Sequence, residues 1–267
     1  MVQERSSLAK PDAVPATAEF RGLSYPGQVP AHLFLHGFTA TPEECRFLAE
    51  CVHADGYAAW VPVLAGHASS VEELARTRWQ DWYRTVEEAA AIIGAAKEPL
   101  VIVGQSLGGL LALHLAATRP NWVRGIVLLA PALFLRARWL ETVRPALPWL
   151  ARIRPFWPRG QSDLADPQAR RDRVGYEQIP LRALGELLEL QSIVRREVER
   201  VHQPTLIVQS RQDHTCSWQG VEWLQTRLRG FVETLELRRS YHVVSLDYDR
   251  AVVARAILRF VARTLNA

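Results

Sequence analysis

A serine flanked by glycines is the residue of this sequence best suited to covalent chemistry. Ser106 lies between Gly104 and Gly108, directly after the apolar stretch 100–103 and before a helical pattern over 107–117. A sharp strand-to-helix turn needs glycines on either side, because a Cβ there would clash with neighbouring backbone. Such a turn lifts the hydroxyl clear of the sheet, and the helix N-terminus favours developing negative charge. The pattern predicts a nucleophile elbow; a glycine-rich turn without chemistry is the alternative.

A nucleophilic serine needs a base and an orienting acid, which come from other strand ends in the chain order Ser, Asp, His. Asp213 lies just past an expected strand at 204–210, and His242 follows an expected strand at 232–237. Both positions should project their side chains toward Ser106. His242 would accept the serine proton, and Asp213 would fix the imidazole tautomer and stabilise the imidazolium. We therefore predict a catalytic triad of Ser106, Asp213 and His242.

Other residues near this acid and base could compete for the same roles. His214 neighbours Asp213, but a histidine on the acid's own loop should point elsewhere. Asp247 and Asp249 lie close to His242 in sequence, and we interpret both as caps on the last helix. Asp213 remains the preferred acid.

Acyl transfer through a tetrahedral intermediate needs two N–H donors for its oxyanion. Leu107, the residue after the nucleophile, should supply one of them. The backbone of Phe38, in the loop after the first core strand, should supply the other, because Gly37 lets the backbone approach the site. His36 is interpreted as a brace for this loop rather than as a catalytic group.

Apolar runs and helical patterns alternate along most of the chain. Thr41, Pro42 and Glu44 have the spacing of a capping box that opens a helix, and Thr77 is expected to cap a later one. Strands that are apolar along their whole length and are separated by helices predict a parallel sheet covered on both faces. The strands are expected at 31–35, 58–63, 100–103, 125–129, 204–208 and 232–237, and the helices at 41–56, 77–93, 107–117, 218–228 and 249–265.

The alternation breaks once, over residues 133–203, which show only helical or irregular patterns. This segment is too long for a plain crossover, so we expect a helical cap inserted above the sheet between two late strands. The fold prediction is an α/β protein with a mostly parallel, doubly wound sheet. Its expected parts are a polar lead-in at 1–22, a core at 23–132 and 204–267, and the cap at 133–203.

The net charge of +4 falls entirely on the middle of the chain, where residues 131–203 hold 13 Arg against 9 acidic residues. Between 136 and 160, six Arg and one Glu alternate with aromatic and aliphatic residues, and four prolines break the stretch into short turns. The favoured interpretation packs these aromatic residues on the core and leaves the Arg in solvent. The second is a transient contact with a lipid surface. No nucleic-acid-binding motif accompanies the Arg residues, so nucleic acid is not expected as a partner.

The composition limits the class of protein. The chain has 267 residues, of which 48% are apolar and 22% charged, and this excludes a disordered or collagen-like chain. No apolar run is long enough for a transmembrane segment, and the first twenty residues lack the apolar block of a secretory signal, so a cytoplasmic location is expected. Three cysteines are too few for a disulfide framework, and no Cys/His spacing resembles a zinc site.

From about Leu33 to its C-terminus, the chain resembles the α/β-hydrolase superfamily, and within it the small bacterial carboxylesterases and monoacylglycerol lipases. The resemblance implies the triad and the two oxyanion donors named above, and a compact helical cap over an acyl pocket. The matching segments are Leu35-His36-Gly37-Phe38-Thr39-Ala40-Thr41-Pro42, Pro62 to His67, Trp79-Gln80-Asp81-Trp82, Val103-Gly104-Gln105-Ser106-Leu107-Gly108-Gly109, Asp213 and Tyr241-His242-Val243-Val244-Ser245-Leu246-Asp247.

We therefore expect a serine carboxylesterase that cleaves short- to medium-chain acyl esters, monoacylglycerols among them, through an acyl-enzyme. No metal or organic cofactor is expected, and the chain should act as a monomer or homodimer on a small acyl ester. His67, on the loop after the second expected strand, and Trp139 and Trp149 in the cap are the candidate substrate-binding residues. The alternatives are a C–C bond hydrolase or acyltransferase with the same triad, and a non-catalytic relative that binds a small ligand.

Overall fold

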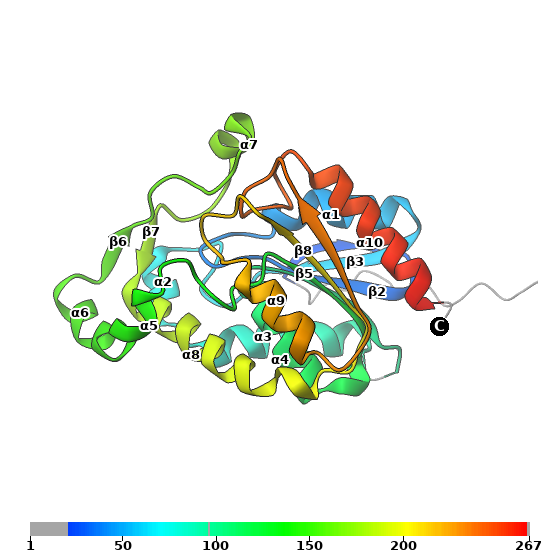
Figure 1. Ribbon diagram of the computed structural model, residues 1–267, viewed down its shortest axis with the longest axis horizontal. Coiled ribbons are helices and arrows are strands. Elements are labelled where there is room, and N and C mark those ends of the chain that lie inside the picture. Colours follow the sequence, from blue (N-terminus) through cyan, green and yellow to red (C-terminus); the bar gives the residue numbers. More distant parts are fainter. Residues whose placement is uncertain (1–20, 96, 266–267) are drawn as a thin grey trace, which may run out of the picture.

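A seven-stranded sheet forms the centre of the computed structural model, which describes residues 21–95 and 97–265 (Figure 1). The strand order is β1-β3-β2-β4-β5-β8-β9; β1 runs antiparallel to β3, and all other neighbours are parallel. The strands are β1 (Gly22–Tyr25), β2 (Gln28–Leu35), β3 (Tyr57–Pro62), β4 (Leu100–Gln105), β5 (Val123–Leu129), β8 (Thr205–Ser210) and β9 (Val232–Leu237). The mostly parallel α/β sheet is confirmed. The predicted lead-in at 1–22 lies almost entirely outside the described residues.

Helices cover both faces of the sheet and create two apolar cores. One face packs against α1 (Glu43–Ala54) and α10 (Arg250–Leu265). The other packs against α3 (Trp79–Ile93), α4 (Leu107–Thr118), α8 (Leu181–Glu197) and α9 (Gln219–Arg227). Strands covered on both faces need apolar side chains on both, which explains why β4 is buried along its whole length. No helix among the described residues is both long and apolar enough to cross a membrane.

The segment between β5 and β8 contains more than helices. It holds α5 (Trp139–Val143), α6 (Leu147–Ile153), α7 (Pro167–Asp172) and α8, and also two short strands, β6 (Phe156–Pro158) and β7 (Gln178–Pro180). These strands pair antiparallel in a sheet of their own, so the expectation of helical and irregular structure alone was wrong. Three-residue strands give too short a pattern to be seen in a sequence. In Figure 1, α5, α6 and the β6–β7 pair lie at the end of the molecule farthest from the C-terminus.

The predicted capping box at the start of α1 was also wrong. The helix begins at Glu43 after Pro42, and no side chain caps it. The Thr41 hydroxyl is buried and has no hydrogen-bond partner in the described part of the chain, and the Glu44 carboxylate accepts the N–H of Gly37 instead. The spacing was right for a cap, but a neighbouring loop uses the carboxylate.

Candidate active site

Ser106 stands at the junction of β4 and α4 in a strained backbone conformation. Its φ of 53° and ψ of −108° lie in a region that costs a non-glycine residue about 1–3 kcal/mol. The two glycines around it make this turn possible. A Cβ on Gly104 would lie 2.2 Å from the Gly108 carbonyl oxygen, and a Cβ on Gly108 would lie 2.1 Å from the Leu35 carbonyl oxygen. The turn therefore has the geometry of a nucleophile elbow.

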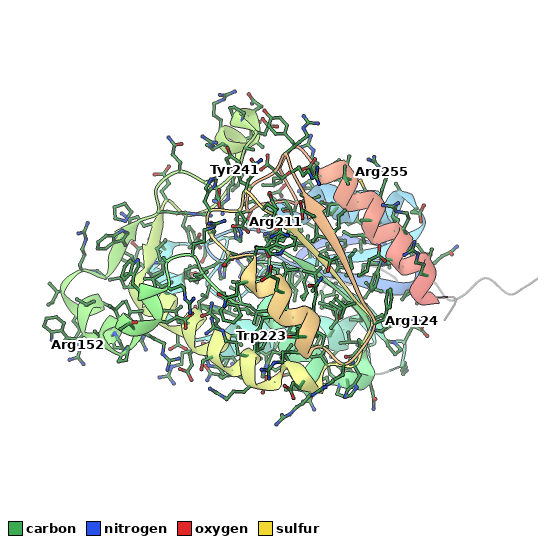
Figure 2. The ribbon with its side chains drawn as sticks, viewed as in Figure 1. Arg124, Arg152, Arg211, Trp223, Tyr241 and Arg255 are labelled. Atoms are coloured by element: carbon green, nitrogen blue, oxygen red, sulfur yellow. The ribbon has the colours of Figure 1, made fainter. Side chains whose placement is uncertain are left out.

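A buried acid–histidine pair is formed by the two loops that follow β8 and β9. His242 Nδ1 lies 2.9 Å from Asp213 Oδ2, and Asp213 has no exposed surface. The other carboxylate oxygen, Oδ1, accepts backbone N–H bonds from Thr215 at 2.8 Å and Cys216 at 2.7 Å. Both loops lie at the carboxyl edge of the sheet, where Figure 2 labels the neighbouring residues Arg211 and Tyr241. Asp213 is thus fixed from both sides of its carboxylate.

The pair sets the tautomer and the basicity of His242. With Nδ1–H donated to Asp213, the neutral imidazole carries its lone pair on Nε2, the nitrogen that can accept a proton. Burial is the largest single effect on His242 and lowers its pKa, but the Asp213 carboxylate and a further contribution from Cys216 together more than offset burial, so the pKa lies well above its usual value. Burial also raises the pKa of the Cys216 thiol, which stays protonated at neutral pH. His242 is therefore a stronger base than a free imidazole.

The elbow and the histidine loop are joined directly. The side-chain amide of Gln105 donates a 3.1 Å hydrogen bond to the His242 carbonyl oxygen, so the residue before Ser106 holds the base's backbone. Within the described residues, no hydrogen bond links the Ser106 hydroxyl to His242. Such bonds are commonly long before substrate binds and tighten afterwards. The structure thus assembles the acid–base half of the predicted triad and places its loop against the elbow.

The competing residues have other partners. His214 is largely exposed, and its Nδ1 lies 2.8 Å from Asp163 Oδ1, away from Asp213. Asp249 Oδ2 accepts bonds from the backbone of Arg239 and from both the backbone and hydroxyl of Ser240. Asp247 accepts the backbone N–H groups of Ala165, Asp166, Tyr241 and Tyr248. The expectation that Asp247 and Asp249 cap the last helix was therefore wrong, because both carboxylates brace the histidine loop.

The predicted oxyanion donors flank the serine. A Cβ on Gly37 would lie 3.6 Å from the Ser106 Cβ, so the Gly37–Phe38 backbone lies against the nucleophile. Leu107 is the first residue of α4, where backbone N–H groups have no partner within the helix. Neither the Phe38 nor the Leu107 N–H donates a bond to another described residue.

His36 braces this loop, as expected. Its Nε2 accepts the N–H of Leu64 at 3.3 Å, so Nδ1 carries the proton and donates to the Gly37 carbonyl oxygen at 3.0 Å. Burial lowers the pKa of His36, which keeps the ring neutral. The imidazole thus connects the loops after β2 and β3.

Two buried charged residues escaped the sequence reasoning. Glu44 Oε1 accepts the Gly37 N–H at 2.7 Å, and Glu44 Oε2 lies 3.7 Å from the guanidinium of Arg173, with both side chains almost fully buried. The cap also binds this loop through its backbone, since the Tyr176 N–H donates to the Thr39 carbonyl oxygen. The sequence offered only the presence of a Glu seven residues after Gly37, and the fit of this Glu to a capping box hid its role in the loop.

The three predicted substrate-binding residues lie elsewhere than expected. His67 is buried rather than at a rim: its ring packs edge-on against His36, Phe38 and Trp82, and burial lowers its pKa to about 3. Trp139 on α5 and Trp149 on α6 are 63% and 61% exposed. The residue that α6 buries is Leu147, not Trp149. The structure does not bring these tryptophans to Ser106.

Asp213, Cys216 and His242 also offer one carboxylate, one thiol and one imidazole within 4.8 Å of one another, a set that could hold a metal ion. Their hydrogen bonds argue for a different use. Both Asp213 oxygens accept N–H bonds, His242 Nδ1 is bonded to one of them, and the thiol is protonated. Metal binding would require these bonds to break.

The elbow's steric requirement can be tested with a matched pair of glycines. Gly108→Ala forces a Cβ onto the Leu35 backbone and should lower the free energy of unfolding by about 1–3 kcal/mol or more. Gly185→Ala, in α8, meets nothing closer than Leu147 Cδ1 at 3.8 Å and should raise it by about 0.5–1 kcal/mol. Urea denaturation measures both, and equal effects would contradict the crowded turn.

The role of Glu44 can be separated from that of its neighbour. Glu44→Ala leaves the Gly37 N–H without its acceptor and Arg173 buried without its partner, so it should cost about 3–5 kcal/mol of stability and lower kcat. Glu43→Ala removes only an exposed pair with Arg46 and should change little. Denaturation and steady-state kinetics on a soluble ester provide the comparison. Two variants that behave alike would show that Glu44 does not support the loop.

Comparison with known proteins identifies the family of this chain. Residues 30–249 match the family model Hydrolase_4, described as serine aminopeptidase, S33. The chain is 30% identical over 238 residues to a thermostable monoacylglycerol lipase of Bacillus sp. (strain H-257), covering 86% of this chain and 90% of that protein. It is 26% identical over 242 residues to a carboxylesterase of Bacillus subtilis (strain 168), covering 90% and 95%.

Solved structures give the same result. A solved structure from work on LipS and LipT, two metagenome-derived lipolytic enzymes, superimposes on this chain with a TM-score of 0.84 at 28% identity. The superposition covers 91% of this chain and 97% of that structure's chain. A monoacylglycerol lipase of Paleococcus ferrophilus, at 19% identity and a TM-score of 0.78, shares the fold and covers 91% and 98%. The chain therefore belongs to the Hydrolase_4 family of α/β-hydrolases and is a serine hydrolase of the lipase and esterase kind.

Proposed function

We propose that this protein hydrolyses carboxylic esters with Ser106 as nucleophile, His242 as general base and Asp213 as the orienting acid. The observation that carries the proposal is the 2.9 Å bond between His242 Nδ1 and a fully buried Asp213, on a loop tied to the elbow. In this tautomer His242 Nε2 can accept a proton. We assign the Ser106 hydroxyl, which the elbow presents, as the group that gives it.

The reaction follows from these roles. The Ser106 oxygen attacks the ester carbonyl carbon while His242 takes the hydroxyl proton, and the positive imidazolium is stabilised by Asp213. His242 then gives that proton to the leaving alcohol, which departs and leaves an acyl group on Ser106. Water, deprotonated by the same Nε2, attacks the acyl-enzyme, and the acid is released as the serine recovers its proton.

The carbonyl oxygen becomes negative in both tetrahedral intermediates and needs fixed donors. We assign this role to the N–H groups of Phe38 and Leu107, which no described residue uses as hydrogen-bond donors. Removing one such donor typically costs about 10²–10³-fold in kcat. Glu44 and His36 support the donors by holding Gly37, which precedes Phe38. These contacts support our assignment of an oxyanion hole that is formed before substrate binds.

We further propose short- to medium-chain acyl esters, monoacylglycerols among them, as substrates. The support is similarity over most of the chain to a carboxylesterase and to a monoacylglycerol lipase. A lipid substrate would also suit the cap, whose outer helices expose large apolar side chains.

The first test uses p-nitrophenyl esters from acetate to palmitate. The wild-type protein should hydrolyse the short and medium members, with the highest kcat/KM below palmitate. Ser106→Ala should lose at least about 10³-fold in kcat on every ester without a change in thermal stability. Turnover that survives in this variant would rule out Ser106 as the nucleophile, and a rate that peaks at palmitate would revise the substrate class.

The acid can be tested through pH. The pKa of His242 is raised above its usual 6.5. A plot of kcat/KM against pH should therefore have a rising limb whose midpoint lies above pH 6.5. In Asp213→Asn the raising charge is gone and burial lowers the pKa, so the limb should move to lower pH while kcat falls on the order of 10⁴-fold. Asp249→Asn should leave the limb in place. A shift in Asp249→Asn and none in Asp213→Asn would identify Asp249 as the acid.

A further inference from the structure

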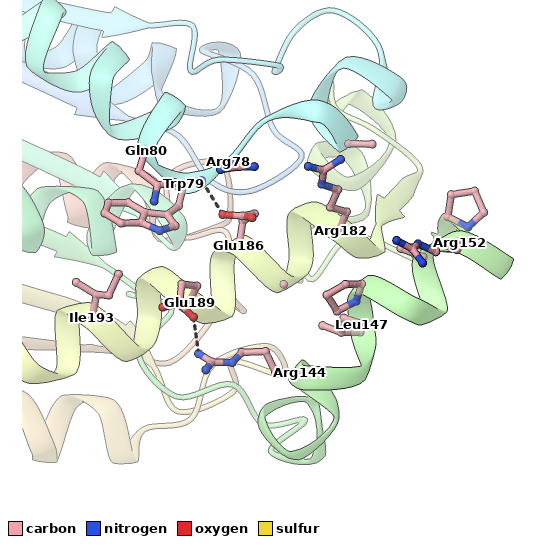
Figure 3. A pocket seen from close by; sticks show the side chains of 15 residues that line it. Arg78, Trp79, Gln80, Arg144, Leu147, Arg152, Arg182, Glu186, Glu189 and Ile193 are labelled. Carbon is pink, nitrogen blue, oxygen red and sulfur yellow. Dashed lines mark hydrogen bonds and ion pairs between the residues drawn. The ribbon is translucent and has the colours of Figure 1, made fainter.

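A basic groove lies on the outer side of the cap, away from the predicted triad. A cavity of about 880 Å³ runs between α6, α8 and the start of α3, and neither Ser106, Asp213 nor His242 lines it (Figure 3). Four arginines line it, together with apolar residues of α3 and α6. The arginines are Arg78, Arg144, Arg152 and Arg182.

Among the described residues, three of these guanidinium groups have no carboxylate partner. Arg144 pairs with Glu189 at 3.0 Å, and the other acidic residue of the groove, Glu186, accepts the backbone N–H of Trp79. Arg78, Arg152 and Arg182 form no ion pair with any residue in the described part of the chain. Figure 3 shows their guanidinium groups bordering the groove from the start of α3, from α6 and from α8. Such a set is suited to bind a phosphate, which accepts several N–H bonds at once.

Exposed apolar side chains lie beside the basic groove, on α6 and on β6. Trp149 and Ile153, which are 61% and 68% exposed, share one face of α6 because they are four positions apart, and Arg152 neighbours Trp149 at three positions. Trp157 follows on β6 at 51% exposure, with the Arg154 guanidinium 4.6 Å above its ring. Large apolar residues rarely gather on a surface that faces only water. Indoles among cationic side chains are instead typical of the membrane interface.

The position of this surface suits docking. Figure 2 labels Arg152 at the outer tip of the cap and Tyr241, the neighbour of His242, far from it. The stretch 136–160, which supplies most of the surface, holds six Arg and one Glu. Its charge is therefore opposite to that of an acidic bilayer.

We propose that this face docks on an anionic phospholipid bilayer. The groove of Arg78, Arg152 and Arg182 holds a headgroup phosphate, while Trp149, Ile153 and Trp157 enter the interface between headgroups and acyl chains. The apolar residues favour a bilayer, because its interface takes up indoles and an aliphatic side chain while the lipid phosphates contact the arginines. The proposal concerns binding and does not depend on the chemistry assigned to Ser106.

The test is co-sedimentation with vesicles, using the full chain with Ser106→Ala so that no lipid is consumed. The protein should bind vesicles of equimolar phosphatidylglycerol and phosphatidylcholine at least tenfold more tightly than vesicles of phosphatidylcholine alone. Binding should weaken in high salt, where charges are screened within about 3 Å. Equal binding to the two vesicles would overturn the proposal.

Variants then locate the surface. Arg152→Glu/Arg182→Glu should weaken binding to the anionic vesicles about 25-fold or more, since each basic side chain near such a surface contributes about fivefold. Arg255→Glu/Arg259→Glu makes the same charge change on exposed positions of α10 and should bind like the parent. If the two double variants bind equally, the effect is one of net charge, and the groove has no specific role. Thermal unfolding verifies that both variants are folded.

The apolar half needs its own variant. Trp149→Ser/Trp157→Ser should weaken vesicle binding at least tenfold while leaving binding to a soluble polyanion, polyuridylic acid, unchanged. If the serine variant binds vesicles as well as its parent, the indoles do not insert. If polyuridylic acid binds more tightly than the vesicles do, the surface recognises nucleic acid and the bilayer is excluded.

Discussion

A carboxylate with no exposed surface is stable in its ionised form only if protein groups replace the water it has lost. Asp213 meets this requirement with two backbone N–H bonds on one oxygen and the His242 imidazole on the other. The same bonds that stabilise the charge also fix its direction, so Asp213 can orient His242 and raise its pKa. The rest of the site depends on this buried pair, because it determines which nitrogen of His242 is free to take a proton.

The cap is part of the scaffold of this site as well as its cover. Asp163 accepts the backbone N–H groups of His242 and Val243 through its carbonyl oxygen, and its carboxylate binds His214 and Thr215 on the acid's loop. Other cap contacts reach the oxyanion loop, through Arg173 to Glu44 and through Tyr176 to Thr39. One inserted segment therefore contacts the acid loop, the histidine loop and the oxyanion loop, whereas its outer side carries the basic and apolar surface.

Several residues were assigned to the wrong partner, and the reasons are physical. Glu44 has the spacing of a capping box, and Asp249 directly precedes a helix. Local sequence patterns therefore predict that both carboxylates cap the N-terminus of a helix. In the folded protein, buried loops compete for these acceptors. The Gly37 N–H donates to Glu44, and the Ser240 N–H donates to Asp249. Both N–H groups are buried away from water and need an acceptor within the protein. Trp149 shows the opposite error, since its apolar character predicted burial and the structure exposes it.

The amino-acid sequence by itself determined the strand–serine–helix elbow, the mostly parallel sheet and the chain order of Ser106, Asp213 and His242, because local periodicity and glycine sterics encode these features. Tertiary structure alone decided which acceptor serves each buried N–H, where His67 and Trp139 lie, and that Gln105 holds the loop of His242. Those contacts join residues up to 137 positions apart. A buried polar group that has lost water must find a hydrogen-bond partner within the protein. Which partner it finds cannot be predicted from the local sequence pattern.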